Sequence, residues 1–262
     1  VELAQGRGVD LGPTASGLFD SATLNDPQGR LKLLAVGQLL YEAYQQDKAI
    51  GYEIGLNTQF TSHGFVGYGV LTYPTLGEAL DFGMRFATLR TPFVSMSRHQ
   101  VQALVAVEAQ AAFDLGPVRQ VSLEHFLIGI WHVAKLLAQA SGIDDLGCEL
   151  YFEHPKPECH ADYADRLPPC HFGAPAYQLR FPAQHLAMPL KTADATAARL
   201  ATAYCENEAQ RQQPAGSTVT ARVQAVLATR TAPPLLGDVA GELHMSPRSL
   251  KRKLRAEHTA YK

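Results

Sequence analysis

The most informative stretch of the chain is its end, HMSPRSLKRKLRAEHTAYK, residues 244–262. It holds six of the chain's 23 Lys and Arg residues, five of them between Arg248 and Arg255. A single acidic residue, Glu257, accompanies them. Such a concentration of positive charge is typical of a segment that binds a polyanion, although a solvated basic helix face has the same composition.

The pattern around this stretch predicts a helix, a turn and a second helix. Ser246 is suited to cap the second helix, and Pro247 fits its first position, where a missing N–H costs nothing. Five apolar side chains would face inward: Ala240, Leu243, Met245, Leu250 and Leu254. Five others would face outward and contact DNA: Arg248, Ser249, Lys251, Arg252 and Arg255. In a major groove, Arg can donate two hydrogen bonds to guanine, and Lys can neutralise phosphates.

The distribution of charge divides the chain in the same way. Residues 229–262 carry seven basic and three acidic residues, a net of +4. The rest of the chain carries 16 basic and 22 acidic residues, a net of −6, and the two parts sum to −2. The run Pro-Ala-Gly-Ser at 214–217 is typical of a break between domains. We therefore predict one domain at 1–213, a linker at 214–217 and a second domain at 218–262.

Hydrophobic periodicity predicts an α+β fold for the first domain and an all-helical second domain. Helices are expected at 31–46 (buried), from a capping box at Thr75 to about Leu89, at 122–140 and at 192–213. Strands are expected at 52–60, 148–155 and 175–182, with two more in 93–113 that turn near Arg98-His99. The glycine-rich run 63–74 is expected to form turns.

The overall composition indicates a soluble globular protein, with 46% hydrophobic and 18% charged residues. No apolar run is expected to span a bilayer, and the N-terminus lacks a signal-peptide pattern. Four scattered cysteines predict a reduced, cytoplasmic compartment. We expect no metal site, because the His, Cys and acidic residues between His154 and His171 include no C-x-x-C pair. We also expect no cofactor, because HGFVGYG (63–69) fits neither a phosphate loop nor a dinucleotide fingerprint.

Two arginines are candidates for binding a small molecule. Arg85 and Arg90 lie on or just after the helix that begins at Thr75. Either could hold a carboxylate, although a surface ion pair is the commoner arrangement. A domain rich in Leu, Ala and Phe suits an apolar or amphipathic effector.

The 122–140 helix offers a second group of candidates. His125 and His132 share one stripe, with Trp131 beside it, and stand about 10 Å apart along the axis, which is too far to share a metal. Gly129, between them, leaves either space for a ligand or room for close helix packing. The effector candidates from this helix are therefore His125, Trp131 and His132.

Several stretches together resemble one protein family. VAGELHMSPRSLKRKLRAE (239–257) is similar to the first helix-turn-helix of AraC/XylS-family transcription regulators. The earlier part resembles that family's N-terminal sensor of the "arabinose-binding" type, in YEIGL (52–56), HGFVGYGVLTYPTLGEAL (63–80), FEHPKPE (152–158) and HFGAPAYQLRFPAQHLAMPL (171–190). The resemblance covers most of residues 30–262. The family usually has Gly where His244 and His258 stand.

This resemblance implies a ligand-responsive regulator rather than an enzyme. Its partners would be promoter DNA, an unknown effector and a second copy of the chain, with RNA polymerase as a further candidate. The 192–213 helix either packs on its own domain or forms part of the dimer interface. The family's DNA-binding domain has two helix-turn-helix units, so we expect this chain to hold the first and tight binding to need the second. The alternatives are a small-molecule enzyme using His125 and His132 or the Cys/His loop, and a ligand-binding module with an incidental basic tail.

Overall fold

The structure, a computed structural model, describes residues 2–19, 31–212, 219–228, 234–243, 245–257 and 259–261. Residue contacts divide the chain into two compact units, Val1–Glu206 and Asn207–Lys262. The boundary falls inside helix α9 (Ala195–Gln212), which lies in the region of the helix predicted at 192–213. The predicted linker at 214–217 lies outside the described residues. The first unit is α+β and the second contains helices, in agreement with the predicted fold class.

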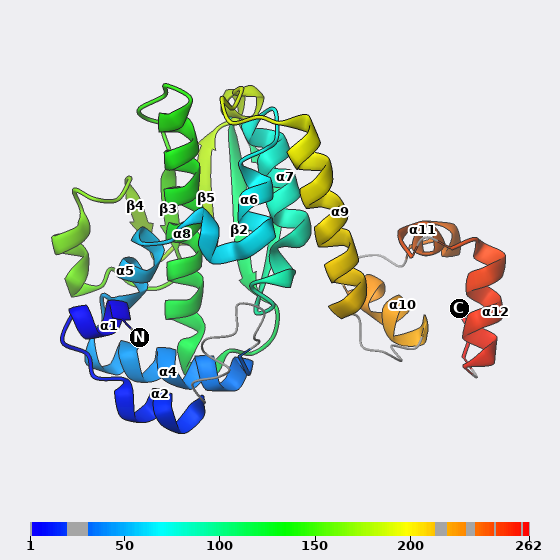
Figure 1. The fold of residues 1–262 in the computed structure, drawn as a ribbon, viewed down its shortest axis with the longest axis horizontal. Coiled ribbons are helices and arrows are strands. Elements are labelled where there is room, and N and C mark those ends of the chain that lie inside the picture. Colours follow the sequence, from blue (N-terminus) through cyan, green and yellow to red (C-terminus); the bar gives the residue numbers. More distant parts are fainter. Residues whose placement is uncertain are drawn as a thin grey trace. The chain divides into compact units, whose positions relative to one another are not determined.

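The first unit contains a five-stranded sheet of order β1-β2-β5-β3-β4 (Figure 1). Its strands are β1 (Val94–Val101), β2 (Leu104–Ala111), β3 (Glu149–Phe152), β4 (Cys170–Phe172) and β5 (Tyr177–Pro182). Neighbouring strands are antiparallel, except β3 and β4, which are parallel. The β1–β2 turn lies at Gln102-Ala103, so the turn predicted near Arg98-His99 is wrong. Arg98 and His99 are polar because that part of β1 is exposed.

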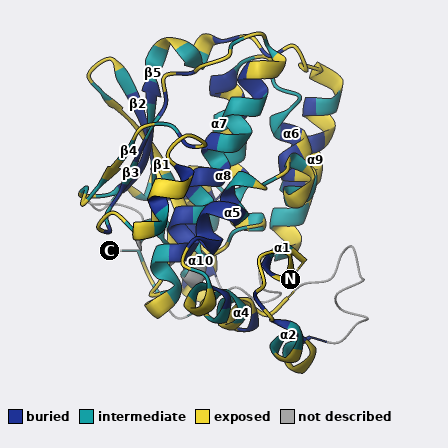
Figure 2. Ribbon diagram, turned by 90° about the vertical axis from the view of Figure 1, so that its left-hand side faces the viewer, coloured by how far each residue is buried: buried dark blue, intermediate teal, exposed yellow. Residues whose placement is uncertain are grey.

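Helix α8 (Arg119–Ala140) is the central helix of this unit and packs on β2, β3 and β5 (Figure 2). It also packs closely on α5 (Ile50–Leu56) through two glycines. A Cβ on Gly55 would lie 2.6 Å from the Ile128 Cβ, and one on Gly51 would lie 2.3 Å from a Glu124 carboxylate oxygen. The strand predicted at 52–60 is therefore wrong, because these small residues permit close helix packing.

The glycine-rich run predicted to form turns contains helix α6 (Gly64–Val70). Here too the glycines mark close packing, because a Cβ on Gly67 would lie 1.8 Å from the Phe60 carbonyl oxygen. The next helix, α7 (Leu76–Phe86), begins as predicted: the Thr75 hydroxyl accepts a hydrogen bond from the Glu78 N–H at 3.2 Å. The 3₁₀ turn η2 (Ala87–Leu89) continues it to the predicted end.

The remaining elements of the first unit are short, apart from α4. They are α1 (Glu2–Gly6), α2 (Gly12–Leu18), α4 (Leu33–Gln46) and the 3₁₀ turns η1 (Phe60–His63), η3 (Gly116–Val118), η4 (Glu158–Tyr163) and η5 (Ala183–Ala187). The helix predicted at 31–46 exists as α4, but the prediction that it is buried is wrong. Leu34 is 90% exposed, and the buried residues of α4 are Ala35 and Ala43.

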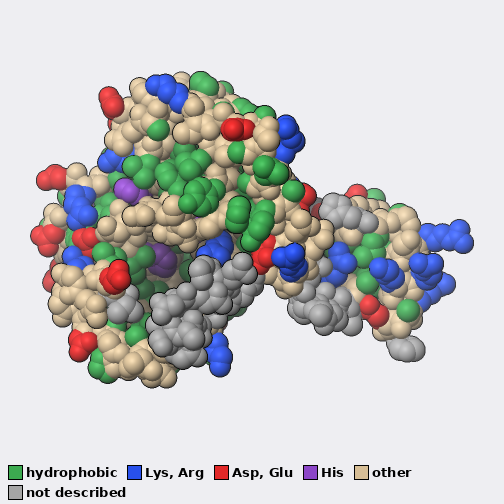
Figure 3. Space-filling view, in the orientation of Figure 1, with side chains coloured by type: hydrophobic (Ala, Val, Ile, Leu, Met, Phe, Trp, Pro, Cys, Tyr) green, Lys and Arg blue, Asp and Glu red, His purple; other side chains and the backbone are tan. Residues whose placement is uncertain are grey.

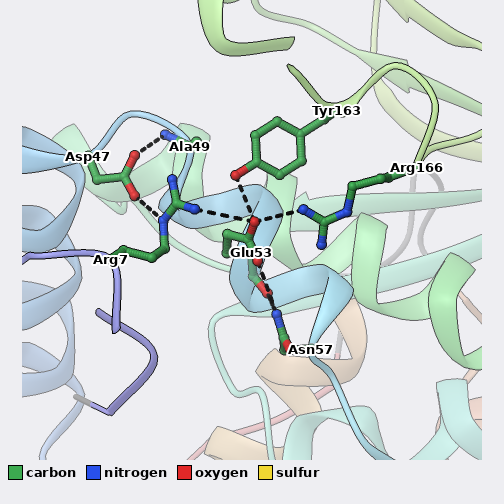
Figure 4. Close-up of polar contacts among 7 residues, drawn as sticks. All are labelled: Arg7, Asp47, Ala49, Glu53, Asn57, Tyr163 and Arg166. Atoms are coloured by element: carbon green, nitrogen blue, oxygen red, sulfur yellow. Dashed lines mark hydrogen bonds and ion pairs between the residues drawn. The ribbon is translucent and has the colours of Figure 1, made fainter. Parts of the chain in front are cut away.

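A polar cluster around Glu53 holds α5 to two distant segments (Figure 4). One carboxylate oxygen accepts hydrogen bonds from the Tyr163 hydroxyl at 2.8 Å and from Arg166 at 2.9 Å. Arg7 reaches the same oxygen at 3.3 Å and pairs with Asp47. Burial alone would raise the pKa of Glu53, but the bonds from Arg166 and Tyr163 outweigh it and lower that pKa. The Glu53 carboxylate is therefore charged and stabilises the fold.

Among the described residues, the helical segment Gly116–Ala140, which comprises η3 and α8, is long and apolar enough to meet the criteria for a membrane span. The sequence had led us to expect no such segment. More than half of its most apolar window is buried inside the first unit. Its apolar side chains include Leu123, Leu127 and Ile128 in the largest core cluster. The helix thus has the features of the core helix of an α+β unit.

The second unit contains α10 (Val219–Ala228), α11 (Leu236–Glu242) and α12 (Pro247–Ala256). Its core includes Ala240, Leu243, Leu250 and Leu254, with Met245 packed against them, so the predicted inward set is confirmed. Val219, Val223 and Val239 complete the described core. The His244 and His258 positions lie outside the described residues.

Candidate DNA-contacting helix and effector cavity

Helix α12 is fixed in the second unit by its cap and its apolar side. The Ser246 hydroxyl accepts a hydrogen bond from the Ser249 N–H at 3.1 Å, and Pro247 occupies the first turn, as predicted. Leu250 and Leu254 are almost fully buried. Because these two residues anchor one side, the opposite side of α12 faces solvent.

All five predicted DNA contacts lie together on this exposed side of α12. Arg248, Ser249, Lys251, Arg252 and Arg255 line one shallow surface with Pro247. The four basic side chains are exposed, and within the described part of the chain none forms an ion pair or a side-chain hydrogen bond. Figure 3 shows Lys and Arg side chains gathered on this unit. An unpaired basic helix face of this kind can bind the phosphates and bases of a duplex.

The acid in the basic stretch has a structural role that the sequence did not reveal. The Glu257 carboxylate accepts hydrogen bonds from the Val219 N–H at 2.6 Å and from the Thr220 N–H and hydroxyl, each at 2.7 Å. It thereby caps the N-terminus of α10, and the bond from the Thr220 N–H contributes most to lowering its pKa. Glu257 therefore stabilises the helix arrangement and leaves the basic face of α12 unneutralised.

The first unit contains a cavity of about 170 Å³ beside α8. Its walls come from η1, α6, α7 and α8, with Met96 of β1 and Thr91 also contributing. Figure 3 shows a hollow on this unit, where a histidine is visible among hydrophobic side chains. Cavities of a similar volume can hold a benzene-sized molecule. The cavity is therefore large enough for a small effector.

Most of the cavity lining is apolar. The apolar side chains are Phe60, Val66, Val70, Leu76, Ala79, Leu80, Met84, Ala87, Met96, Phe126, Ile130, Val133, Ala134 and Leu137. The side chains with polar groups are Thr58, His63, Arg90, Thr91 and His125. This combination of an apolar wall with a few polar groups is typical of small-molecule sites.

Two of the five predicted effector contacts, Arg90 and His125, line the cavity. His125 Nδ1–H donates a hydrogen bond to the Val121 carbonyl at 2.8 Å. Burial lowers the pKa of His125 and of His63, and the positive charge of Arg90 lowers that of His63 further. Both imidazoles are therefore uncharged near neutral pH. His63 was missed because its position in a glycine-rich run gave no sign of a binding site.

The other three predicted effector contacts lie outside this cavity. Arg85 pairs with Glu206 at 2.6 Å. Trp131 is buried in the core, with Lys135 over its ring. His132 lies roughly a third of a turn away from the cavity side of α8, which is centred on Phe126 and Val133.

Helix α6 forms a wall of the cavity and also contacts α9. Val66 and Val70 line the cavity. On α6, the Phe65 ring stacks on Tyr204 of α9, with centroids 3.8 Å apart and planes inclined by 26°. Val66 belongs to the same buried cluster as Ala201 and Cys205 of α9. A displacement of α6 in the cavity wall would therefore change its packing against α9.

The histidines of the Cys/His loop have separate partners. His154 Nε2 lies 3.3 Å from the buried Glu124 carboxylate, while His160 contacts the Tyr52 hydroxyl at 3.3 Å. His171 contacts Glu149 at 3.0 Å. Over the described residues, no three His, Cys, Asp or Glu side chains are grouped in a way that could hold a metal ion.

Comparison with known families gives one match over most of the first unit. Residues 13–190 match the family described as the N-terminal arabinose-binding domain of AraC transcription regulator. This match covers more than half of the chain, and it lies in the unit that contains the cavity.

Curated relatives match nearly the whole chain. It is 26% identical to the ornithine utilization regulator of Pseudomonas aeruginosa, over 97% of this chain and 76% of that protein. It is 29% identical to an uncharacterized HTH-type transcriptional regulator of Mycobacterium bovis, over 100% of this chain and 78% of that protein. Among solved structures, the transcriptional regulator CdpR from Pseudomonas aeruginosa has a similar fold, with a TM-score of 0.53 at 15% identity, over 98% of this chain and 80% of that one.

Proposed function

The chain belongs to the family of AraC transcription regulators with an N-terminal arabinose-binding domain, and from this premise we propose a division of labour between its two units. The cavity beside α8 binds the effector, and α12 contacts promoter DNA. The chain works as a cytoplasmic, ligand-responsive regulator rather than as an enzyme. Its relatives are regulators by name, which supports the same role for this chain.

The observation that carries the DNA-binding part is the basic face of α12. Its five predicted contacts lie on one exposed side, while Leu250 and Leu254 hold the other side in the core. The capped first turns carry Arg248, Ser249 and Lys251, in the part of a recognition helix that meets base edges. The remaining arginines can neutralise phosphates or read guanine.

Operator binding by variants of α12 tests this assignment. We expect Arg252→Ala to weaken binding to the protein's own promoter and to reduce the dependence of affinity on salt by about one counterion. Lys253→Ala is the matched control, because Lys253 is exposed on the same helix but lies outside the five-residue face. Equal losses for both variants would show that the helix contributes only general positive charge.

We propose that effector binding acts through α6. This helix lies against the cavity on one side and against α9 on the other. The continuous helix α9 begins in the first unit and ends in the second. A ligand that favours one position of α6 would therefore favour one position of α9 and shift the population of DNA-binding states.

We also propose that the chain forms a homodimer through the outer sides of α6 and α9. Ala201 and Cys205 of α9 pack inward, whereas Leu200 is 68% exposed and Tyr68 of α6 is 51% exposed. Tyr68 is one helical turn from Phe65, and Leu200 is one turn from Tyr204, the two residues whose rings stack. A patch of exposed apolar side chains is typical of a protein interface. Leu200→Glu is expected to shift the sedimentation coefficient toward the monomer. An unchanged dimer would place the interface elsewhere.

A further inference from the structure

The effector cavity has a polar end and an apolar end. Its polar groups include His125 on α8, while Val133, Ala134 and Leu137 lie farther along the same helix. His125 and Leu137 are twelve residues apart, or about 18 Å along α8 at 1.5 Å per residue. A molecule bound along this wall would therefore have one end near the polar groups and the rest against apolar side chains.

The polar end carries a positive charge that has no partner among the described residues. Arg90 lines the cavity and is exposed to solvent. Its guanidinium forms no ion pair or hydrogen bond with any residue that the structure describes. The guanidinium lies beside Gly64: a Cβ added to Gly64 would be 3.8 Å from Arg90 Cζ. The lining that the described residues form contains no Asp or Glu. An anion bound there would gain a charge-assisted hydrogen bond, whereas an ammonium group would be desolvated without a partner.

The two histidines can adapt to an anion in the same place. The Nδ1–H of His125 is committed to the Val121 carbonyl, so His125 Nε2 is the nitrogen left for a ligand. His63 belongs to the same lining, and it is close enough to Arg90 that the positive charge lowers the pKa of His63. An anion would favour protonation of either ring, and a protonated ring nitrogen can donate to a carboxylate.

We infer that the cavity takes an organic carboxylate with an unbranched or single-ring apolar body, held at its head by Arg90. This inference rests on the proposed role of the cavity as the effector site. The cavity volume of about 170 Å³ suits an apolar body of about seven non-hydrogen atoms, since a cavity of about 150 Å³ holds the six of benzene, and the carboxylate would lie at the exposed Arg90. Diamines and sugars fit poorly, because the described part of the lining offers no carboxylate for an ammonium group and few hydrogen-bonding groups for hydroxyls.

Calorimetric titration of the 262-residue chain tests the inference with three ligands of one length: octanoate, octanamide and octylamine. We expect octanoate to bind at least tenfold more tightly than the other two. Arg90→Gln should lower octanoate affinity at least tenfold and leave octanamide unchanged. Arg85→Gln is the matched control, because that arginine lies outside the cavity and pairs with Glu206. It should leave octanoate binding unchanged.

A cavity-filling variant separates this inference from the proposed site. Ala134→Leu places extra atoms at the apolar end of the cavity and should weaken octanoate binding. If octanamide or octylamine bound the original chain as tightly as octanoate and lost binding in this variant, the site would stand and the carboxylate assignment would be overturned. If octanoate bound both chains equally, the ligand would lie elsewhere and the proposed site itself would be wrong. No binding of octanoate at millimolar concentration would also overturn the inference.

Discussion

The contact between Phe65 and Tyr204 is one of the two by which α6 packs on α9, so its loss is a direct test of the proposed mechanism. The rings stack with centroids 3.8 Å apart and are 50% and 41% exposed. A fully buried Phe costs about 3–5 kcal/mol when cut to Ala, so each half-buried ring should contribute roughly half of that. The stacking itself is worth about 0.5–1.5 kcal/mol. We expect a double-mutant cycle of Phe65→Ala and Tyr204→Ala to give a coupling free energy in that last range.

Urea unfolding followed by tryptophan fluorescence measures this coupling. Trp131 is the chain's single tryptophan and is buried in the core of the first unit, so its emission reports the unit that contains both rings. Phe113→Ala combined with Tyr204→Ala is the control cycle, because Phe113 is 47% exposed and lies among other residues, near Arg119. Independent sites add within about 0.3–0.5 kcal/mol. A Phe65–Tyr204 coupling no larger than that of the control would refute the coupling of α6 to α9 through these two rings.

Three further outcomes are expected from stability measurements. Leu250→Ala should destabilise the second unit by about 2–5 kcal/mol, seen as loss of helical circular dichroism at a temperature where Trp131 emission is unchanged. Ser246→Ala should remove the cap of α12 at a cost of about 1 kcal/mol, and a Gly at this position should cost less. Tyr163→Phe should cost about 1.5–3 kcal/mol at pH 7, because it removes a hydrogen bond to charged Glu53. The folded-state pKa of Glu53 is lowered, so the stability that its carboxylate contributes is fully present above the unfolded pKa of about 4.3. This contribution is lost as pH falls from there through the folded-state pKa. The penalty for Tyr163→Phe should therefore shrink in acid.

The sequence was most informative where the signals are local. The cap at Ser246 and Pro247 and the alternation of leucines with basic residues lie within one short helix, so both sides of α12 could be predicted. The helix that begins at Thr75 was predictable for the same reason. In each case, neighbouring residues suffice to define a helix start and its buried side.

The cavity was harder to predict, because its walls come from segments far apart in the sequence. Residues from Thr58 to Leu137 contribute, and only the fold brings them together. Glycine was also ambiguous: in α5 and α6 it permits close approach of Ile128 and Phe60, although the same residue type in a sequence also indicates turns. His125 and His132 share a helical stripe, but the cavity meets only its edge, so one of the two lines it.

The size and position of α6 explain why a small effector could be sufficient to operate the proposed mechanism. A helix of seven residues is not stable by itself, so its position depends on the surfaces it packs against. The cavity is one of these surfaces and α9 is another. A ligand at 100 times its dissociation constant can contribute about 2.7 kcal/mol to the state it prefers, which exceeds the stacking energy of the Phe65–Tyr204 pair. The binding free energy of a ligand that prefers one position of α6 is therefore large enough to change the packing of α6 against α9.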